Sequence, residues 1–243
     1  MKFKEALGYV ADLFVPRLCV VCGKTLINAE EAEMCLECYV QLPRTNLHKI
    51  PVSASSCGGN PVQEKLAGIL PLKYGAAWFY YNRFSPHSSL VKNAKYSDRP
   101  GVGRKLGRAY AKEIIADVPA MSSEIDVLLP LPMHWFKQLR RGYNQSRQIA
   151  LGLSDVLGIP VGDNLIAIRP HSSQTRSSAA QRQQNVKGIF SVSSPEELNG
   201  LNIAVVDDVI TTGSTITEAV QTLLRQTGAK SVSIFALGTT RLF

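Results

Sequence analysis

The 243-residue sequence predicts an α/β fold, a Rossmann-like parallel sheet flanked by helices, with a small cysteine-rich module at the amino end. Three observations carry this prediction. The continuous apolar run 203–206 suits a strand buried on both faces of a parallel sheet, and a helical pattern stopped by Gly228 follows it. A second buried strand, 125–129, also leads through a loop into a helical pattern. Four cysteines in two closely spaced pairs precede both strands.

The composition is that of a globular protein. Hydrophobic residues make up 45% of the chain and charged residues 19%, which excludes wholesale disorder. The net charge of +8 and the pI near 9.3 favour polyanionic ligands such as pyrophosphate or nucleic acid, without choosing between them. No apolar run approaches the roughly 18 residues that span a bilayer. The amino end shows no signal-peptide cleavage site, so we expect a short helix there and a cytoplasmic protein.

The first four cysteines form the pattern C-x2-C-x12-C-x2-C, made by Cys19, Cys22, Cys35 and Cys38. Paired thiolates at this spacing sit on knuckle turns and converge on a tetrahedral zinc ion, as in zinc ribbons. Four thiolates leave no open position, so the zinc would be structural. Disulfides are the alternative, which the lack of a secretion signal disfavours. Cys57 has no cysteine partner nearby and is a bystander or the remnant of a second site.

A segment rich in proline, serine and glycine divides the chain. We expect the amino-terminal helix and zinc module in residues 1–50, a linker in 51–63 and one larger domain in 64–243. Before the run 203–206, the expected elements of this domain are an aromatic strand 72–81, a helix capped near Ser85 that leads into 92–99, a helix 103–117, the strand 125–129, a helix from Asn144 to about 157, a short strand 165–169 and a polar stretch 169–188. Long polar stretches in α/β domains often serve as lids.

Positive charge gathers at three places. Between the first two helices lie Lys95, Tyr96, Arg99 and Arg104. A solvated helix end is the plainer interpretation of these cations, and contact with a pyrophosphate is the alternative. The polar stretch adds Gln174, Arg182, Asn185 and Lys187, the residues in it best suited to reach a charged substrate.

The third place is the loop after strand 125–129, where prolines stiffen the chain before LRRGYNQS. Guanidinium groups bind phosphate oxygens in a bidentate fork, so this loop is the expected site for a pyrophosphate. Some of its cations, which include Lys137 and Arg147, must face water. The preferred ligands are Arg140, Arg141 and Asn144.

The stretch 203–215, IAVVDDVITTGST, carries the chemistry on which the other predictions depend. Asp207 and Asp208 end the apolar strand at the edge where ligands of open α/β sheets bind, and carboxylates accept hydrogen bonds from vicinal hydroxyls. The next turn opens a helix, whose free N–H groups and dipole favour an anion. Gly213 lets the backbone approach a phosphate, and the hydroxyls beside it can donate to its oxygens. A ribose 5-phosphate suits both parts of the stretch, with hydroxyls for the two acids and a phosphate for the turn. An ordinary turn capped by Asp208 is the alternative.

This stretch resembles the phosphoribosyl pyrophosphate (PRPP) binding motif of type I phosphoribosyltransferases, and no element of that motif is missing. The resemblance implies the parallel sheet of those enzymes. It also implies that Asp207 and Asp208 act in catalysis by contacting the ribose hydroxyls, while the loop after them holds the 5-phosphate. The implied loop ligands are Val209, Thr211, Thr212, Gly213, Ser214 and Thr215.

Nearly the whole chain resembles the ComF/GntX family, in which a four-cysteine zinc module precedes a phosphoribosyltransferase-like domain. The resemblance rests on the cysteine pairs and on VKNAKYSDR, the PLP loop with LRRGYNQS, QTRSSAAQRQQNVKGIF and VVDDVITTGST. Some members are reported to assist DNA uptake during natural transformation. Members often have further cysteine pairs, and only Cys57 follows here, so the sequence does not support a second zinc site.

The resemblance implies displacement of pyrophosphate from carbon 1 of PRPP by a nitrogen nucleophile. An oxocarbenium-like transition state needs positioning and electrostatic stabilisation, and magnesium would neutralise the pyrophosphate. No residue identifies the nucleophile. Three classes stay open, because a fold alone does not decide function: a catalytic phosphoribosyltransferase, a competence factor that holds single-stranded DNA or a helicase partner, and a non-catalytic regulator that senses PRPP or a nucleotide.

Overall fold

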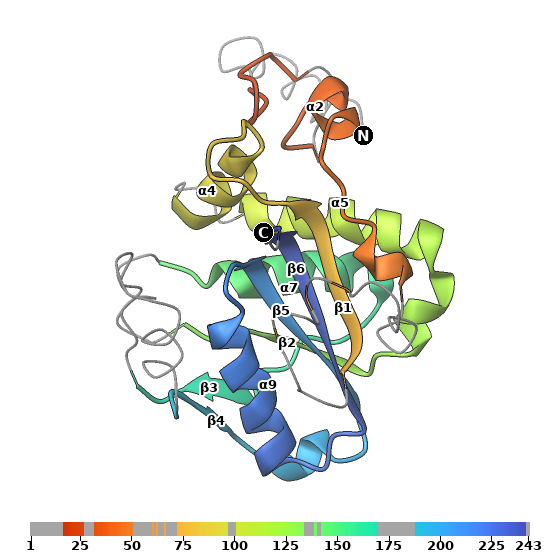
Figure 1. The fold of residues 1–243 in the computed structure, drawn as a ribbon, viewed down its shortest axis with the longest axis vertical. Coiled ribbons are helices and arrows are strands. Elements are labelled where there is room, and N and C mark those ends of the chain that lie inside the picture. Colours follow the sequence, from red (N-terminus) through yellow and green to blue (C-terminus); the bar gives the residue numbers. More distant parts are fainter. Residues whose placement is uncertain are drawn as a thin grey trace, which may run out of the picture.

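The computed structural model describes residues 17–26, 32–50, 60, 62, 66, 72–96, 101–133, 139, 142–169 and 188–241. Its centre is a four-stranded sheet in which all neighbouring strands are parallel (Figure 1). The strands lie side by side in the order β1 (Leu72–Tyr80), β6 (Ser231–Thr239), β5 (Asn202–Ile210) and β2 (Val127–Pro130). The predicted parallel sheet is confirmed.

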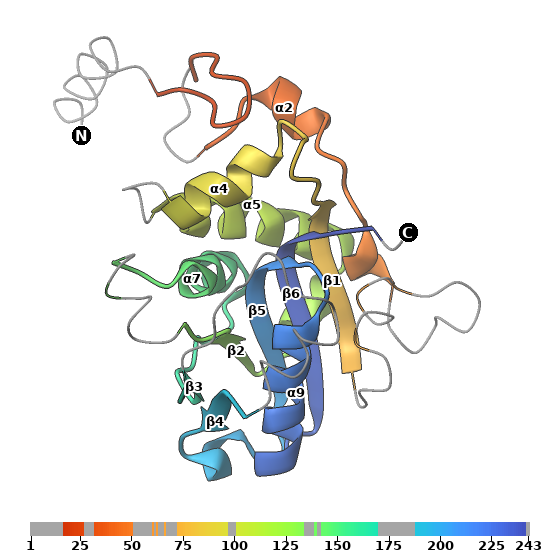
Figure 2. The ribbon, with the colours of Figure 1, turned by 60° about the vertical axis from the view of Figure 1, so that its left-hand side comes forward.

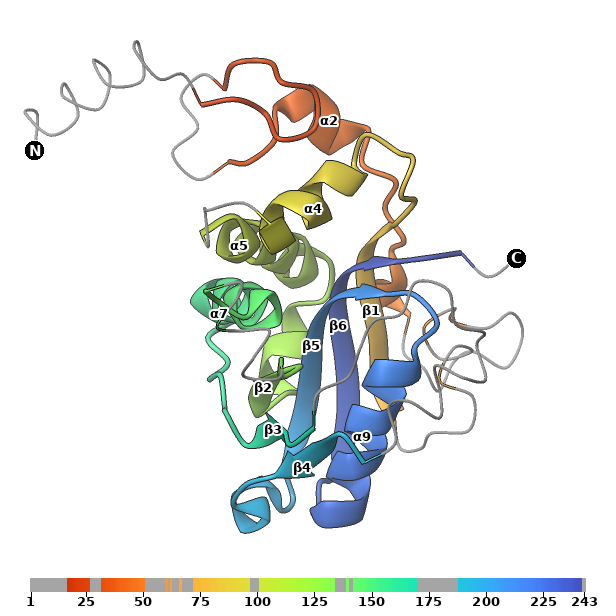
Figure 3. The ribbon, with the colours of Figure 1, turned by 90° about the vertical axis from the view of Figure 1, so that its left-hand side faces the viewer.

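Helices cover both faces of the sheet (Figures 2 and 3). One face carries α4 (Ser88–Tyr96), α5 (Gly101–Asp117) and α7 (Gln145–Leu157), and the other carries α9 (Ser214–Gln226). Strand β5 divides its side chains between the two cores, as the period of a strand requires. Ala204 and Val206 pack under α5 and α7, whereas Ile203 and Val205 pack under α9. The apolar run is therefore buried on both faces, as predicted.

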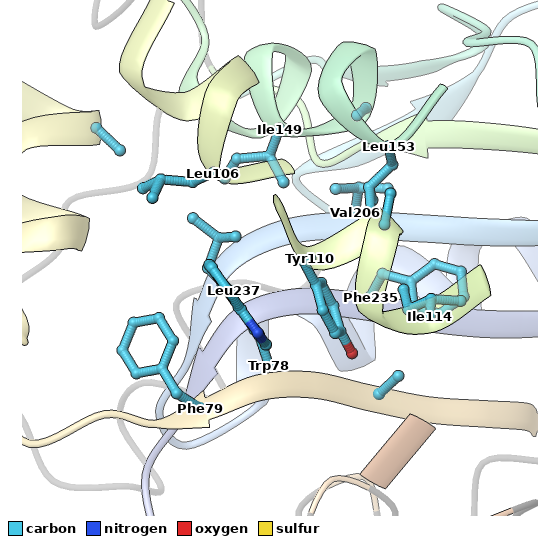
Figure 4. Close-up of a cluster of buried hydrophobic side chains, with 14 of the residues drawn as sticks. Trp78, Phe79, Leu106, Tyr110, Ile114, Ile149, Leu153, Val206, Phe235 and Leu237 are labelled. Atoms are coloured by element: carbon cyan, nitrogen blue, oxygen red, sulfur yellow. The ribbon is translucent and has the colours of Figure 1, made fainter. Parts of the chain in front are cut away.

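The core between the sheet and α5 is aromatic. Trp78 of β1 stacks on Tyr110 of α5, with ring centroids 5.7 Å apart and ring planes at 18° (Figure 4). Ile149 and Leu153 of α7 are fully buried in the same cluster. This packing holds α5 and α7 over the sheet and thereby fixes where α7 begins.

Helices α5 and α7 approach each other closely because each has a glycine, without a side chain, where it contacts the other helix. A Cβ atom at Gly152 would overlap the backbone carbonyl of Arg104, and one at Gly107 would overlap the carbonyl of Ile149. Neither backbone can yield without moving its helix. Glycine at these two positions is thus required by the helix spacing and not by backbone conformation.

The remaining elements are short. They are α2 (Leu36–Val40), the 3-10 turns η1 (Leu47–Lys49), η3 (Pro119–Ser123) and η4 (Pro195–Leu198), and the antiparallel pair β3 (Leu165–Ala167) and β4 (Phe190–Val192). Among the described residues no helix is long and apolar enough to cross a membrane.

The predicted strands and helices of the larger domain are confirmed to within a few residues. Asn144 is the N-cap of α7, and Gly158 ends this helix with a left-handed φ of 73°. One expectation was wrong: β5 does not end at the two acids. It continues to Ile210, because the equally long β6 pairs with it along its whole length. The carboxylates therefore lie on a strand that is paired with β6 and not on a free loop.

The segment after α2 pairs with the outer edge of β1. Thr45 N donates to Trp78 O over 3.0 Å, and Tyr80 N donates to Pro43 O over 2.8 Å. Arg44 forms a bidentate ion pair with Glu113 of α5. Most of the expected linker and the amino-terminal helix lie outside the described residues, so the domain boundaries stay a prediction.

We expect Gly152→Ala to destabilise the fold by about 1–3 kcal/mol, since the new methyl group must push α7 away from α5. Urea unfolding monitored by circular dichroism measures this. Gly101→Ala is the matched control, because Gly101 opens α5 and a Cβ there meets nothing within 4 Å. Equal stability of the two variants would contradict the close helix contact.

Candidate functional site

Asp208 is a buried carboxylate at the carboxyl end of the sheet. Its side chain is 5% exposed, and Lys95 near the end of α4 donates from Nζ to its Oδ1 over 3.1 Å. Its Oδ2 atom is buried without a hydrogen-bond partner among the described residues. A buried oxygen in this state costs free energy unless a ligand donates to it. The Oδ2 atom of Asp208 can thus accept a hydrogen bond from a ligand.

Asp207 shares this environment. Its Oδ1 accepts hydrogen bonds from Ser146 Oγ over 3.1 Å and from the backbone N–H of Asp208 over 2.8 Å. Burial, reinforced by the neighbouring Asp208 carboxylate, raises the pKa of Asp207 to about 7. Near neutral pH the two acids therefore resist carrying two negative charges, and a cationic partner would relieve the repulsion.

The loop after β5 leads into the amino end of α9. Gly213 is the N-cap residue with a φ of 80°, a conformation that favours glycine, and none of the described side chains caps the helix. The hydroxyls of Thr212 and Ser214 lie 3.1 Å apart at this end. An uncapped helix N-terminus beside hydroxyl groups is a site for an anion such as a phosphate.

The loop after β2 starts beside the acids. Pro130 pairs with Val206, and Leu131 N donates to Val206 O over 2.8 Å, so this loop leaves the sheet next to Asp207. The shared edge that the sequence predicted for the two segments is present. Two of the predicted pyrophosphate ligands, Arg140 and Arg141, lie outside the described residues, as does Arg182 of the polar stretch.

Asn144, the third predicted pyrophosphate ligand, has its side chain engaged inside the protein. Its Oδ1 accepts from the backbone N–H groups of Ser146 and Arg147, and its Nδ2 donates to Leu131 O over 3.1 Å. These bonds fix the start of α7 against the loop. Asn144 therefore positions Ser146, and a direct contact with a ligand stays a prediction.

Sequence reasoning did not find Ser146 and did not assign Lys95 to the acids. The sequence groups Lys95 with Arg104 as a charged helix end, yet Arg104 forms an ion pair with Asp155 at 2.6 Å and does not join the acids in the described contacts. Tyr143 Oη donates to Ala94 O over 2.8 Å, which ties the loop before α7 to the end of α4. Tyr143 and Ala94 are 49 residues apart in the sequence, and Ser146 and Asp207 are 61 apart. No local sequence pattern marks contacts between residues so far apart.

A second site lies in the amino-terminal module. The thiol sulfurs of Cys19, Cys22, Cys35 and Cys38 all lie within 4.8 Å of one another, and none of these cysteines forms a disulfide. Gly23 gives the first pair its turn with a φ of 75°, and Cys35 is the N-cap residue of α2. The four cysteines are close enough to hold a metal ion.

The environment of Cys19 favours its thiolate. Burial alone would raise its pKa, but backbone N–H groups, among them that of Cys35 at 3.3 Å from Sγ, lower the pKa to about 7. Burial and the neighbouring cysteines instead raise the pKa of Cys38, so a bound cation would be needed to hold all four cysteines as the thiolates that bind a metal ion. His87, just before α4, holds the module from outside, since its Nε2 lies 3.0 Å from Cys38 O.

The chain is similar to one protein family and to individual proteins of known sequence. Residues 138–239 match the family model described as phosphoribosyl transferase domain. The chain is 35% identical over 155 residues to competence protein F of Haemophilus influenzae, covering 63% of this chain and 67% of that protein. It is 31% identical over 154 residues to DNA utilization protein YhgH of Escherichia coli K12, covering 63% of this chain and 66% of that protein. The matches thus span about two thirds of the length of these relatives.

Solved structures with a similar backbone include a glutamine PRPP amidotransferase from Bacillus subtilis, with a TM-score of 0.41 and 25% identity over 60% of this chain and 30% of that one. A purine phosphoribosyltransferase from Pyrococcus horikoshii has a TM-score of 0.35 and 19% identity over 60% of this chain and 87% of that one.

The raised pKa of Asp207 predicts an inverse pH dependence of stability. A carboxyl group whose pKa rises from 3.8 to about 7 on folding keeps its proton in the folded state between these values and loses it in the unfolded state, so stability falls as the pH rises. We expect the ligand-free protein to lose roughly 2 kcal/mol between pH 5 and pH 7 from this group. The Asp207→Asn variant should lack that loss, and urea unfolding at several pH values measures it.

Asp155 supplies the control, because its pKa is shifted in the direction opposite to that of Asp207. The guanidinium group of Arg104, with Arg108, lowers the pKa of Asp155 to about 2, so its contribution to stability is complete at both pH 5 and pH 7. Asp155→Asn should lower stability equally at the two pH values. Parallel pH profiles of the wild type and Asp207→Asn would show that Asp207 titrates normally.

Proposed function

The chain belongs to the ComF family of proteins with a phosphoribosyl transferase domain, and from this premise we propose that it binds PRPP and transfers the phosphoribosyl group to a nitrogen nucleophile, releasing pyrophosphate. The observation that carries the proposal is the unpartnered Oδ2 of Asp208, buried beside Asp207 at the edge where β5 leads to the uncapped α9. A ribose ring with two hydroxyls and a 5-phosphate supplies a donor for the acids and an anion for the helix.

In the proposed complex the ribose hydroxyls donate to Asp207 and Asp208, and the 5-phosphate lies on the loop of Thr211, Thr212, Gly213, Ser214 and Thr215. Val209 separates the acids from this loop and contributes backbone only, because its side chain packs against the core. The hydrogen bond from a sugar hydroxyl to an ionised carboxylate is worth about 1.5–3 kcal/mol. Ribose binding therefore provides the energy that keeps the acid pair charged.

Lys95 and Ser146 hold the acids ready for this role. The ammonium group of Lys95 offsets the charge of Asp208, and the hydroxyl of Ser146 fixes the orientation of Asp207. As pyrophosphate leaves carbon 1, positive charge develops on the ribose ring, and the nearby carboxylates stabilise it. The carboxylates also suit a magnesium ion, which would neutralise the pyrophosphate. Arg140, Arg141 and Arg182 are the proposed ligands of the leaving pyrophosphate.

The relatives suggest a second candidate, a part in DNA uptake. One relative is named a competence protein and another a DNA utilization protein, and the net charge of this chain is +8. In this alternative the chain would hold single-stranded DNA or a helicase partner. DNA affinity that falls steeply with salt concentration would support it. PRPP binding without pyrophosphate release would instead support a non-catalytic regulator.

The proposed metal in the cysteine module is zinc. Four cysteine sulfurs within 4.8 Å of one another suit the tetrahedral coordination that zinc prefers. With no open position, the ion would stabilise the module without taking part in the reaction. Unpaired thiols fit a reducing compartment, so we propose a cytoplasmic location.

Metal analysis should find about one zinc ion per chain. Cys35→Ser should lose the ion and loosen the module, which limited proteolysis would detect. Cys57→Ser is the control and should retain the ion. Reduced wild-type protein without metal would contradict the zinc proposal.

The double variant Asp207→Asn, Asp208→Asn should weaken binding of magnesium and PRPP by at least about 100-fold, because two charged acceptors are lost. Isothermal titration calorimetry measures this affinity. The matched control is Asp126→Asn. Asp126 accepts hydrogen bonds from Asn202 at the opposite end of β5, so this variant should bind PRPP normally. Unchanged affinity of the folded double variant would refute the ribose assignment.

A further inference from the structure

A groove of about 360 Å³ lies between the cysteine module and helix α5. Its floor is apolar, because Met34 of the module and Leu106 of α5 are buried there and Ala109 is partly buried beside them. Leu36, the first residue of α2, lines one side and is 76% exposed. An exposed leucine beside an apolar floor gains free energy when another apolar surface covers it. The groove thus suits an apolar partner.

Two of the three cations along the groove are paired with acids of the same chain. Lys105 Nζ lies 3.0 Å from Glu33 Oε1, and Arg108 Nε lies 2.7 Å from Asp155 Oδ2. These acids offset the positive charge, so the groove offers little attraction to a polyanion such as a nucleic acid. The long stems of the two cationic side chains add apolar surface to its sides. The groove therefore favours an apolar surface over a charged one.

The chain enters the cysteine module beside this groove. Val20 N donates to Glu33 O over 2.9 Å, and Glu33 lines the groove. Arg17 is the first residue that the structure describes, and at most about 10 Å of chain separates it from Val20. Residues 1–16 lie outside the described residues, and the point from which they extend is next to the groove.

The sequence of residues 1–16 carries an apolar stripe at helical spacing. The stripe consists of Phe3, Leu7, Val10 and Phe14, which share one face of the helix that the sequence predicts there. Such a helix is about 16 Å long between the two phenylalanines, enough to lie along the groove. Two lysines and two acids leave its side chains without net charge. Helices that bind anionic membrane surfaces are instead rich in lysine and arginine.

We propose that the groove is the docking site of the chain's own amino-terminal segment, residues 1–16. The segment lies in the groove as a helix, with its apolar stripe against Met34, Leu36 and Leu106. Its covalent link to the module gives it an effective concentration in the millimolar range, which exceeds that of a second copy of the chain in dilute solution. Docking covers the exposed leucine and holds the cysteine module against α5.

Limited proteolysis of the full chain with chymotrypsin tests this docking. The rate of cleavage after Tyr9 follows the fraction of molecules in which the segment is undocked. Leu36→Gln removes an apolar contact from the groove and should raise this rate about 10-fold or more, with an unchanged circular dichroism spectrum. Val40→Gln is the matched control, because Val40 is 68% exposed on the same helix and does not line the groove.

A second pair of variants changes the segment itself. Leu7→Gln interrupts the stripe and should also raise the rate of cleavage after Tyr9 about 10-fold or more. Glu5→Gln, on the polar face of the expected helix, should leave this rate unchanged. This pair keeps the test decisive where Leu36→Gln disturbs the module. Equal cleavage rates in the wild type, Leu36→Gln and Leu7→Gln would overturn the proposal.

A photocrosslink identifies what fills the groove. The photoreactive amino acid p-benzoylphenylalanine, placed at position 7 of the full chain, should crosslink within one chain to Met34 or to α5, which mass spectrometry of the digested product detects. Crosslinks that join two chains would overturn the proposal in favour of a second copy. Protection of Tyr9 that arises only with phosphatidylglycerol vesicles would also overturn it, since the segment would then bind a membrane surface.

Discussion

The cost of burying two adjacent carboxylates is the constraint on which the rest of the site depends. Asp208 is buried and Asp207 is partly buried beside it, so their carboxylates repel each other. One oxygen of Asp208 has no partner in the described part of the chain. A protein of marginal stability keeps such an arrangement only where the surrounding structure holds it in place. Lys95 and Ser146 do this from two different helices. The site is therefore built by tertiary packing around a strand that would otherwise be an ordinary apolar one.

The packing that brings these partners together can be followed from the core outward. The aromatic cluster around Trp78 and Tyr110 seats α5 on the sheet, and Gly107 and Gly152 let α7 lie against α5. Asn144 then fixes the first turn of α7, and Ser146 in that turn reaches Asp207. Each of these contacts restricts the position of the next element. The orientation of the Ser146 hydroxyl group therefore depends on the contact between α5 and α7, which lies far from it.

The sequence predicted the elements with strong local signals and missed the contacts made by tertiary structure. The apolar run before Asp207 and the glycine at 213 are local features, so the strand, turn and helix could be predicted together. The contact between Lys95 and Asp208 depends on how α4 lies over the sheet, which no local pattern encodes. The extent of β5 was wrong for the same reason, since the partner strand β6 sets it.

Helix α4 connects the cysteine module to the acids. His87 precedes its first turn and lies 3.0 Å from the carbonyl of Cys38, and Lys95 in its last turn contacts Asp208. A helix of nine residues is about 13 Å long and stiff over that distance. A metal ion that fixes Cys38 would therefore also fix the helix that presents Lys95. In this arrangement a metal ion held by the module would stabilise the charge balance of the acid pair, so the proposed zinc would affect ligand binding without contacting the ligand.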